Sequence, residues 1–191
     1  MPVTINGNGT ITGISAGGLP DGCVTADDLA SGVGGKILQV KQTVKTDTAS
    51  STADSFTNIG PTVAITPSSN TNKILVRFTF VGFGSAASYV HFFRLAKGGS
   101  AITGSVGDSA GSRTQACTAI DTYGEGGSSY VQTSFEFLDE PATTSATTYS
   151  IQHKRSSSSA GTFYIGRNYY DDNDIQSARF PTIITAMEVA A

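Results

Sequence analysis

Apolar and polar side chains alternate along most of this chain, and helical periodicity is nearly absent. The clearest run covers residues 73–82. Side chains of a strand point alternately to opposite faces, so one face of this run is wholly apolar and the other is mixed. The apolar face comprises Ile74, Val76, Phe78 and Phe80, and the mixed face comprises Leu75, Arg77, Thr79 and Val81. This pattern predicts a central β-strand.

Seven further runs, separated by Gly, Ser, Asn and Pro, predict additional short strands. They cover residues 37–45, 62–66, 89–96, 130–138, 148–155, 162–166 and 182–189. Because no helix is available to cover a sheet, we predict an all-β head over residues 36–191, an antiparallel jelly-roll-like β-sandwich. The long polar connections are expected on its rim, where binding loops are also found. They cover residues 47–55, 104–115, 119–129 and 168–179.

Residues 1–35 have a different composition, and we interpret them as an N-terminal arm with one short helical turn at 25–30. The arm's apolar side chains stand apart among Gly and small polar residues, so one copy buries too little surface to offset the entropy of ordering it. They are Ile11, Ile14, Leu19, Val24 and Leu29. These side chains can meet across a threefold axis of three copies, or become ordered on a larger partner surface. Their regular recurrence favours these two explanations over a disordered tail.

The charge of the chain narrows the classes of partner. Charged residues make up 14% of the sequence, and the formal net charge is −3 with a pI near 5.2. This balance provides no basic field for nucleic acid or for an anionic membrane surface. No window approaches the ~18 apolar residues of a membrane span, and the N-terminus lacks the pattern of a cleaved signal, so we expect synthesis in a cytoplasm. Cys23 and Cys117 indicate neither a zinc site nor a disulfide framework, although a single bridge between them stays open.

The sequence predicts no catalytic residues, no metal and no cofactor. His91 and His153, the only two histidines, alternate in phase with apolar and aromatic neighbours, so we expect both to be satisfied structural or interface residues. A glycosidase needs two facing carboxylates, a pairing that a sequence does not reveal. Carboxylates that keep this alternative open are Asp121, Glu125, Glu136, Asp139 and Glu140.

The connection at 168–179 contains the best candidate ligand-binding residues: Tyr169, Tyr170, Asp171, Asp172 and Asp174. Exposed tyrosines beside carboxylates stack on sugars or contact proteins, so this loop is the first candidate site if the head binds a surface glycan. The oxygen-rich set also suits a hard cation, but it lacks the Gly and the distal Glu of an EF-hand loop. A solvated turn between two strands is the simpler interpretation.

Five segments, taken in order, carry a resemblance to a known family: ITGISAGGLPDGCVTADDLASG, GGKILQVKQ, ITPSSNTNKILVRFTF, FLDEPATTSATTYSIQ and ITAMEV. From about Ile11 to Val189, the chain resembles the tail-fibre-like virion proteins of tailed bacteriophages, including many from marine and cyanobacterial phages. The resemblance implies a short trimeric connector followed by a β-sandwich head. Long tail fibres carry a large N-terminal adaptor and a shaft, whereas about 35 residues precede the head here, which implies a very short projection.

Together, the resemblance and the residue patterns predict a non-enzymatic protein on the virion surface, made in the host bacterial cytoplasm. It is expected to be a homotrimer whose arm binds capsid or tail proteins. As a tail fibre it would bind a host glycan through rim loops, and three linked sites would add avidity. As a capsid decoration protein, a cement or head-fibre protein, it would clamp capsid subunits. The alternatives are a glycan depolymerase and a free, monomeric glycan-binding module.

Overall fold

The computed structural model describes residues 4–5, 11–12, 35–122 and 129–191. The chain divides into two compact units, Met1–Lys36 and Ile37–Ala191. In the first unit, β1 (Thr4–Ile5) and β2 (Ile11–Thr12) pair in antiparallel fashion. The predicted helical turn at 25–30 lies outside the described residues. So do the side chain of Ile11 and the other predicted arm contacts, Ile14, Leu19, Val24 and Leu29.

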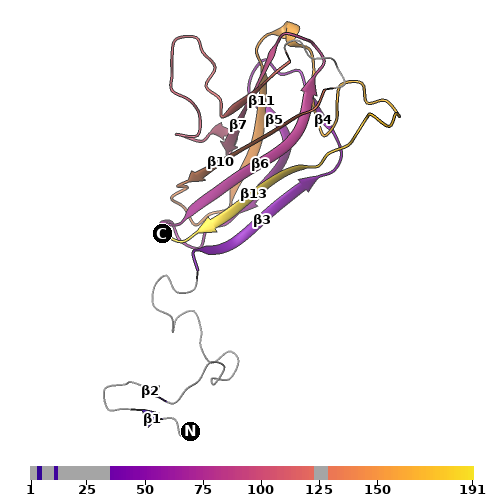
Figure 1. The fold of residues 1–191 in the computed structure, drawn as a ribbon. Helices are drawn as coiled ribbons and strands as arrows, with labels where there is room; N and C mark the ends of the chain where they lie inside the picture. The colour runs from indigo at the N-terminus through magenta and orange to yellow at the C-terminus, as the bar shows by residue number, and fades with distance from the viewer. Residues whose placement is uncertain (1–3, 6–10, 13–34, 123–128) are drawn as a thin grey trace. The chain divides into compact units, whose positions relative to one another are not determined.

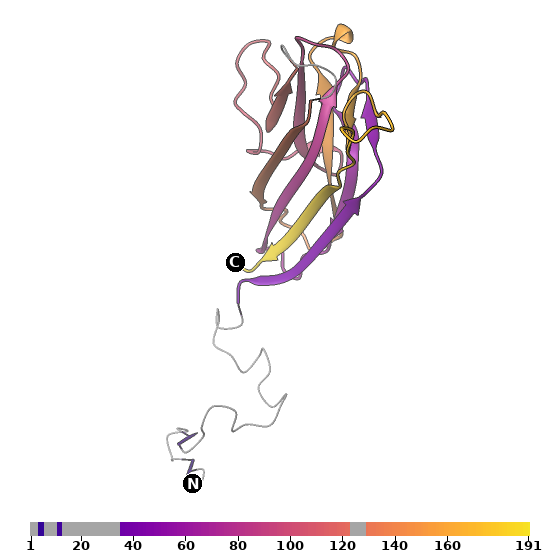
Figure 2. The same ribbon diagram turned by 45° about the vertical axis from the view of Figure 1, so that its right-hand side comes forward.

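The second unit is an all-β sandwich of two antiparallel sheets, which confirms the predicted fold class (Figures 1 and 2). The first sheet contains β3 (Ile37–Lys45), β4 (Ala49–Ser51), β6 (Lys73–Gly84), β10 (Val131–Asp139), β12 (Phe163–Ile165) and β13 (Thr182–Val189). The second contains β5 (Thr57–Ile65), β7 (Val90–Lys97), β8 (Ser100–Ala101), β9 (Thr118–Asp121) and β11 (Thr147–Arg155). In Figure 1, β3, β13, β6 and β10 form one layer, with β5, β11 and β7 behind it.

The predicted central strand is confirmed as β6, which extends two residues further, to Gly84. Strand β10 pairs along one edge of β6, while β13 and then β12 pair along the other. In the second sheet, β7 pairs with β11 on one side and with β8 and β9 on the other. The order across the principal strands is therefore β3-β13-β6-β10 in one sheet and β5-β11-β7-β9 in the other.

The inner faces of the two sheets enclose a core centred on three phenylalanines. Phe80 of β6 lies 4.9 Å, ring centroid to centroid, from Phe93 of β7 in the opposite sheet, and Phe163 of β12 lies 4.9 Å from Phe93. All three rings are fully or almost fully buried. Offset and edge-to-face pairs of this kind add to the burial free energy, so this cluster ties the two layers together.

Several strand boundaries differ from the prediction. Strand β5 begins at Thr57, five residues before the predicted run, because Gly60 and Pro61 concealed its first half. Proline is tolerated there because β5 lies at the edge of its sheet. Strand β4 lies inside the predicted loop at 47–55, and β9 overlaps the one at 119–129. Both are short segments whose pairing partners lie far away in the sequence, at β12 and β7.

Glu188 of β13 is a buried carboxylate that joins three separate segments. It is 1% exposed. Its Oε1 accepts hydrogen bonds from the backbone N and Oγ of Ser68, at 2.6 and 2.7 Å, and from Nδ2 of Asn72 at 2.7 Å, while Oε2 accepts one from Gln39. Burial raises the pKa of Glu188, but the hydrogen bonds from Asn72, Gln39 and Ser68 outweigh burial and lower it to about 2.

We predict that Glu188→Gln lowers the free energy of unfolding at neutral pH by about 1–3 kcal/mol. The amide nitrogen of the new side chain would place its two N–H donors against groups that themselves donate to the carboxylate in wild type. The matched control is Glu140→Gln, whose carboxylate pairs with Lys73 while 70% exposed, and which should change stability by less than ~0.5 kcal/mol. Chemical denaturation measures both. Because the folded pKa lies below the ordinary 4.5, the advantage of wild type is complete above pH 4.5 and declines as the pH falls toward 2. Equal effects of the two substitutions would contradict this role.

Candidate functional site

The candidate ligand-binding loop connects β12 to β13 and projects from the sandwich (Figure 1). Gly166 closes its base: the N–H of Gly166 donates to the carbonyl of Val81 at 2.7 Å, and its carbonyl accepts from the N–H of Phe180 at 3.0 Å. Gly166 has φ +80, and a Cβ built there would lie 3.1 Å from the Phe180 carbonyl oxygen. A glycine is therefore required at this point, because other residues would be strained there.

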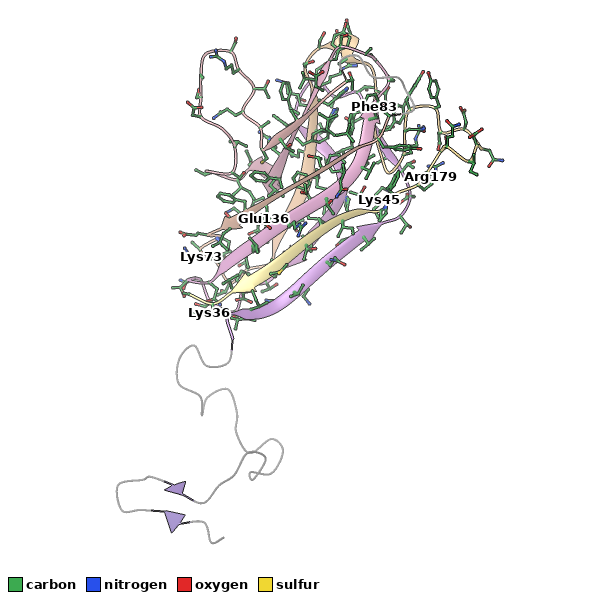
Figure 3. The ribbon with its side chains drawn as sticks, viewed as in Figure 1. Lys36, Lys45, Lys73, Phe83, Glu136 and Arg179 are labelled. Carbon is green, nitrogen blue, oxygen red and sulfur yellow. The ribbon has the colours of Figure 1, made fainter. Side chains whose placement is uncertain are left out.

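Asp171 organises the first half of the loop. One carboxylate oxygen lies 2.6 Å from Arg179 and the other 3.5 Å from Arg167, so the two ends of the loop share one anion. Figure 3 labels Arg179 where the chain returns to the sandwich. The N–H of Asp171 donates to Oδ1 of Asn168, which is 2% exposed. These bonds hold Asp171 at φ 55, in the left-handed region.

The second half of the loop is held by Tyr130, the residue before β10. Its hydroxyl donates to the carbonyl of Gln176 at 2.9 Å and accepts from the N–H of Ala178 at 2.7 Å. Its ring packs edge-on against Phe180, with centroids 5.2 Å apart. Asp174 Oδ1 accepts from the N–H of Gln176 at 2.8 Å and so caps a turn within the loop.

Two tyrosine rings of this loop are exposed to solvent. Tyr169 and Tyr170 are 38% and 54% exposed, with ring centroids 5.2 Å apart. Tyr164 of β12 lies 6.0 Å from Tyr169, and the guanidinium of Arg167 lies 3.9 Å from the centre of the Tyr164 ring. The Arg167 cation over the Tyr164 ring stabilises the ring on which Tyr169 packs. The arrangement is a short aromatic platform on a braced loop.

The structure thus brings all five sequence-predicted residues into one loop and separates their roles. Asp171 and Asp174 are engaged in holding the loop. Asp172 is exposed and makes no hydrogen bond or ion pair among the described residues, so it is available to a ligand together with the two tyrosines. A surface hollow of about 270 Å³, lined by Asp171, Asp172, Asn173, Asp174, Ser177 and Arg179, lies beside them. Across the described ranges, no group of three or more His, Cys, Asp or Glu side chains is arranged to hold a metal ion.

The supporting residues were not identified from the sequence. Arg167 precedes the predicted connection and Arg179 ends it, and two cations on either side of three aspartates are a signal that suggests ion pairing. Tyr130 gave no such signal, because it lies 46 residues from its hydrogen-bond acceptor, Gln176.

Of the carboxylates that kept a glycosidase open, Asp139 and Glu140 are engaged in ion pairs, and Glu136 faces away from Asp139. Asp139 is buried, and each of its carboxylate oxygens accepts a hydrogen bond from Lys97 Nζ at 2.9 Å, while Oδ2 also accepts one from the Tyr149 hydroxyl at 2.7 Å. This burial beside an anion raises the pKa of Tyr149 well above its ordinary value. Glu140 pairs with Lys73 at 2.6 Å. Glu136 is exposed on the opposite side of β10 from Asp139, and Glu125 lies outside the described residues.

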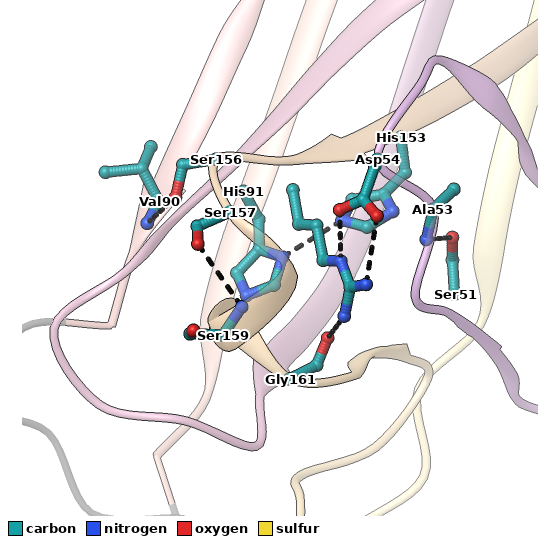
Figure 4. Close-up of polar contacts among 11 residues, drawn as sticks. Ser51, Ala53, Asp54, Val90, His91, His153, Ser156, Ser157, Ser159 and Gly161 are labelled. Carbon is teal, nitrogen blue, oxygen red and sulfur yellow. Dashed lines mark hydrogen bonds and ion pairs between the residues drawn. The ribbon is translucent and has the colours of Figure 1, made fainter.

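His91 and His153 lie together inside the sandwich, at the end of the aromatic core (Figure 4). Both are fully buried, and Nδ1 of His91 lies 3.0 Å from Nε2 of His153, so one ring donates to the other. Both rings pack on Phe163, with centroids 4.8 and 5.5 Å away. Both histidines were predicted to lie on sheet faces as structural residues. The structure places both on the inner faces of the sandwich. The prediction that both are satisfied is wrong in part, because His91 Nε2 and His153 Nδ1 have no partner among the described residues.

The surroundings of the pair favour neutral imidazoles. Burial lowers the pKa of His91 to about 4 and that of His153 to about 3, and the nearby charge of Arg155 acts in the same direction. Arg155 itself is fixed by Asp54, with Nε and Nη2 at 2.7 and 3.2 Å from the two carboxylate oxygens. Gly84 faces His91, and a Cβ at that position would come 2.5 Å from Nε2. The pair is thus enclosed in the core, out of reach of a substrate.

Comparisons with known proteins add no family assignment to these observations. No protein-family model matches the chain, and no curated protein matches its sequence. No helix in the described part of the chain is long and apolar enough to cross a membrane.

We predict a steep loss of stability between pH 6.5 and 4.5 that arises from the histidine pair. Unfolded histidines titrate near 6.5, whereas the folded ones stay neutral to about 4 and 3, so the unfolded state binds more protons as the pH falls. Two such groups give a slope approaching about 2.7 kcal/mol per pH unit. Denaturation at several pH values measures this slope. In the double variant His91→Asn, His153→Asn, the slope of stability against pH should flatten over this range. A double variant that keeps the wild-type slope would contradict the assignment of this slope to the histidine pair.

Proposed function

We propose that this chain is a non-enzymatic surface protein of a bacteriophage virion: a short homotrimeric fibre whose arm binds the particle and whose head binds a host glycan. The observation that carries the binding role is the braced loop with two adjacent exposed tyrosines. Aromatic faces stack on the apolar faces of sugar rings, and a neighbouring carboxylate such as Asp172 accepts hydrogen bonds from sugar hydroxyls. Because the loop is already held by Asp171 and Tyr130, little ordering entropy is lost on binding.

The distribution of exposed apolar surface supports a protein that works through contacts. Among the described residues, the large hydrophobic side chains that are exposed occur in only two places. Three are in the loop, namely Tyr169, Tyr170 and Ile175, and five are on the first sheet, namely Ile37, Leu38, Val40, Val44 and Leu138. Concentrated patches of this kind mark interaction sites on soluble proteins.

We also infer that the sandwich is a jelly roll. Numbered along the chain, the eight principal strands β3, β5, β6, β7, β9, β10, β11 and β13 have the orders 1-8-3-6 and 2-7-4-5 in the two sheets. This order supports two interlocked Greek keys, the arrangement of many viral capsid and lectin domains. The proposed attachment to capsid or tail proteins through residues 1–35 rests on the family resemblance of the sequence.

The glycan-binding role is tested with purified full-length protein on surface polysaccharides extracted from candidate host bacteria. Tyr170→Ala should weaken binding by roughly tenfold through loss of one stacking surface. Gln176→Ala is the matched control, since it removes an exposed side chain from the same loop, whereas the bonds of Gln176 to Tyr130 and Asp174 are made by its backbone, and it should leave binding unchanged. Release of new reducing ends from the polysaccharide would contradict the non-enzymatic assignment. Equal binding by wild type and Tyr170→Ala would exclude this loop as the site.

The location is tested separately by immunogold electron microscopy of intact particles with an antibody against the head. Label on the tail supports the host-binding fibre, and label spread over the capsid supports a decoration protein instead. Particles without label would contradict both.

A further inference from the structure

The two outer faces of the sandwich differ in how their side chains are occupied. On the second sheet, polar side chains bond to one another: Arg94 Nε donates to Gln152 Oε1 at 2.9 Å, and Ser150 Oγ to Asn58 Oδ1 at 2.9 Å. Arg94 also lies 4.1 Å from the centre of the Phe56 ring. This face satisfies its own polar groups and leaves no large apolar side chain exposed.

The outer face of the first sheet is instead crossed by a row of apolar side chains. The strand register places Val40 of β3 opposite Met187 of β13, Met187 opposite Leu75 of β6, and Leu75 opposite Leu138 of β10. Val40 is 55% exposed and Leu138 is 42% exposed. Four neighbouring strands therefore contribute one continuous apolar band.

A parallel row lies four residues further along the strands, with Val44 of β3 opposite Ile183 of β13. Val44 is 47% exposed, on an edge strand nine residues long. Long apolar edge strands promote association, and natural sheets cover or charge them. Leu138 and Glu136 lie on the same face of β10 as this band, and Figure 3 shows Glu136 in the layer whose strand ends are marked by Lys36, Lys45 and Lys73.

Between the two rows, the face carries one cation and one anion that are unpaired. Arg77 of β6 is directly opposite Glu136 of β10, and both are exposed. Neither makes an ion pair or a hydrogen bond with any described residue, although Lys73 and Glu140 at the end of the same strands pair at 2.6 Å. Hollows of about 400 and 310 Å³ lie on either side of Arg77. The face therefore offers a partner two unpaired charges and two surface hollows.

We propose that this face, defined by Val40, Val44, Leu75, Arg77, Glu136 and Leu138, is the surface through which the heads of identical copies associate. A second copy fits because the face is charge-complementary to itself: in a closed ring, each copy offers Arg77 to one neighbour and Glu136 to the other. The inference deepens the proposed homotrimer and rests on it in one respect. Strand β3 begins at Ile37, directly after the unit proposed to join the copies, so joined arms raise the local concentration of these faces.

The test compares two double variants of the full-length protein by sedimentation velocity over a range of concentrations. Val40→Lys, Val44→Lys places two charges on the proposed face, and Thr62→Lys, Ala64→Lys places two on exposed positions of β5, the edge strand of the other sheet. Wild type and the β5 variant should form the same oligomer. The β3 variant should associate roughly 100-fold more weakly, since each valine contributes about a tenfold change. Unchanged melting curves would show that both variants fold.

Each outcome separates the face from the arm. An oligomer that the β3 variant leaves intact would overturn the face while leaving an arm-based homotrimer in place. A wild-type protein that is monomeric at every concentration would overturn both the face and the proposed homotrimer. Loss of oligomer in both variants alike would also overturn the face, because the effect would then follow added charge alone.

A charge swap tests the predicted contact between Arg77 and Glu136 of neighbouring copies. Arg77→Glu should weaken association, because two carboxylates then meet across the interface, and Arg77→Glu, Glu136→Arg should restore it. Failure of the double variant to restore association, with its melting temperature equal to wild type, would overturn the pairing.

Discussion

Burial of aromatic rings between the two sheets is the interaction on which the rest of this structure depends. Phe80, Phe93 and Phe163 come from β6, β7 and β12, and their contacts fix how the layers face each other. Close packing also explains why β6 contains glycine where it passes β12 and His91: a Cβ at Gly82 would overlap the Tyr164 carbonyl, and one at Gly84 would press on the imidazole. Once β12 is held by Phe163, the loop after it leaves the sandwich at a fixed place.

The surroundings of the buried ionisable groups determine which of them are charged. Glu188 is kept charged by four donors, whereas the histidine pair is kept neutral by burial, and each arrangement has a lower energy than its alternative protonation state only over a limited pH range. The histidines govern the range from 6.5 to 4.5, and the carboxylate governs the more acidic range. Both are structural devices, and the chemistry offered to a partner is on the surface.

That surface has two distinct regions. The loop displays tyrosines and a free carboxylate, which suits a polar ligand with apolar faces. The first sheet displays aliphatic side chains around one unpaired cation and one unpaired anion, which suits a protein. The second sheet offers neither, because its polar side chains are bonded to one another. A head that binds its own copies by one face and a ligand by a rim loop is consistent with the proposed fibre.

The sequence by itself determined the fold class, the central strand and the loop of interest, because a period of two shows which side chains share a face of one strand. It also identified Tyr169, Tyr170 and the three aspartates as a group. Only the tertiary structure decided that Asp171 is held by Arg167 and Arg179, that His91 meets His153, and that Arg77 is opposite Glu136. The contacts of Asp171 depend on how the loop folds back on itself, and the other two contacts depend on the order of strands in the sheets. That order joins residues about 60 positions apart through the burial of the whole core, and no local pattern encodes it.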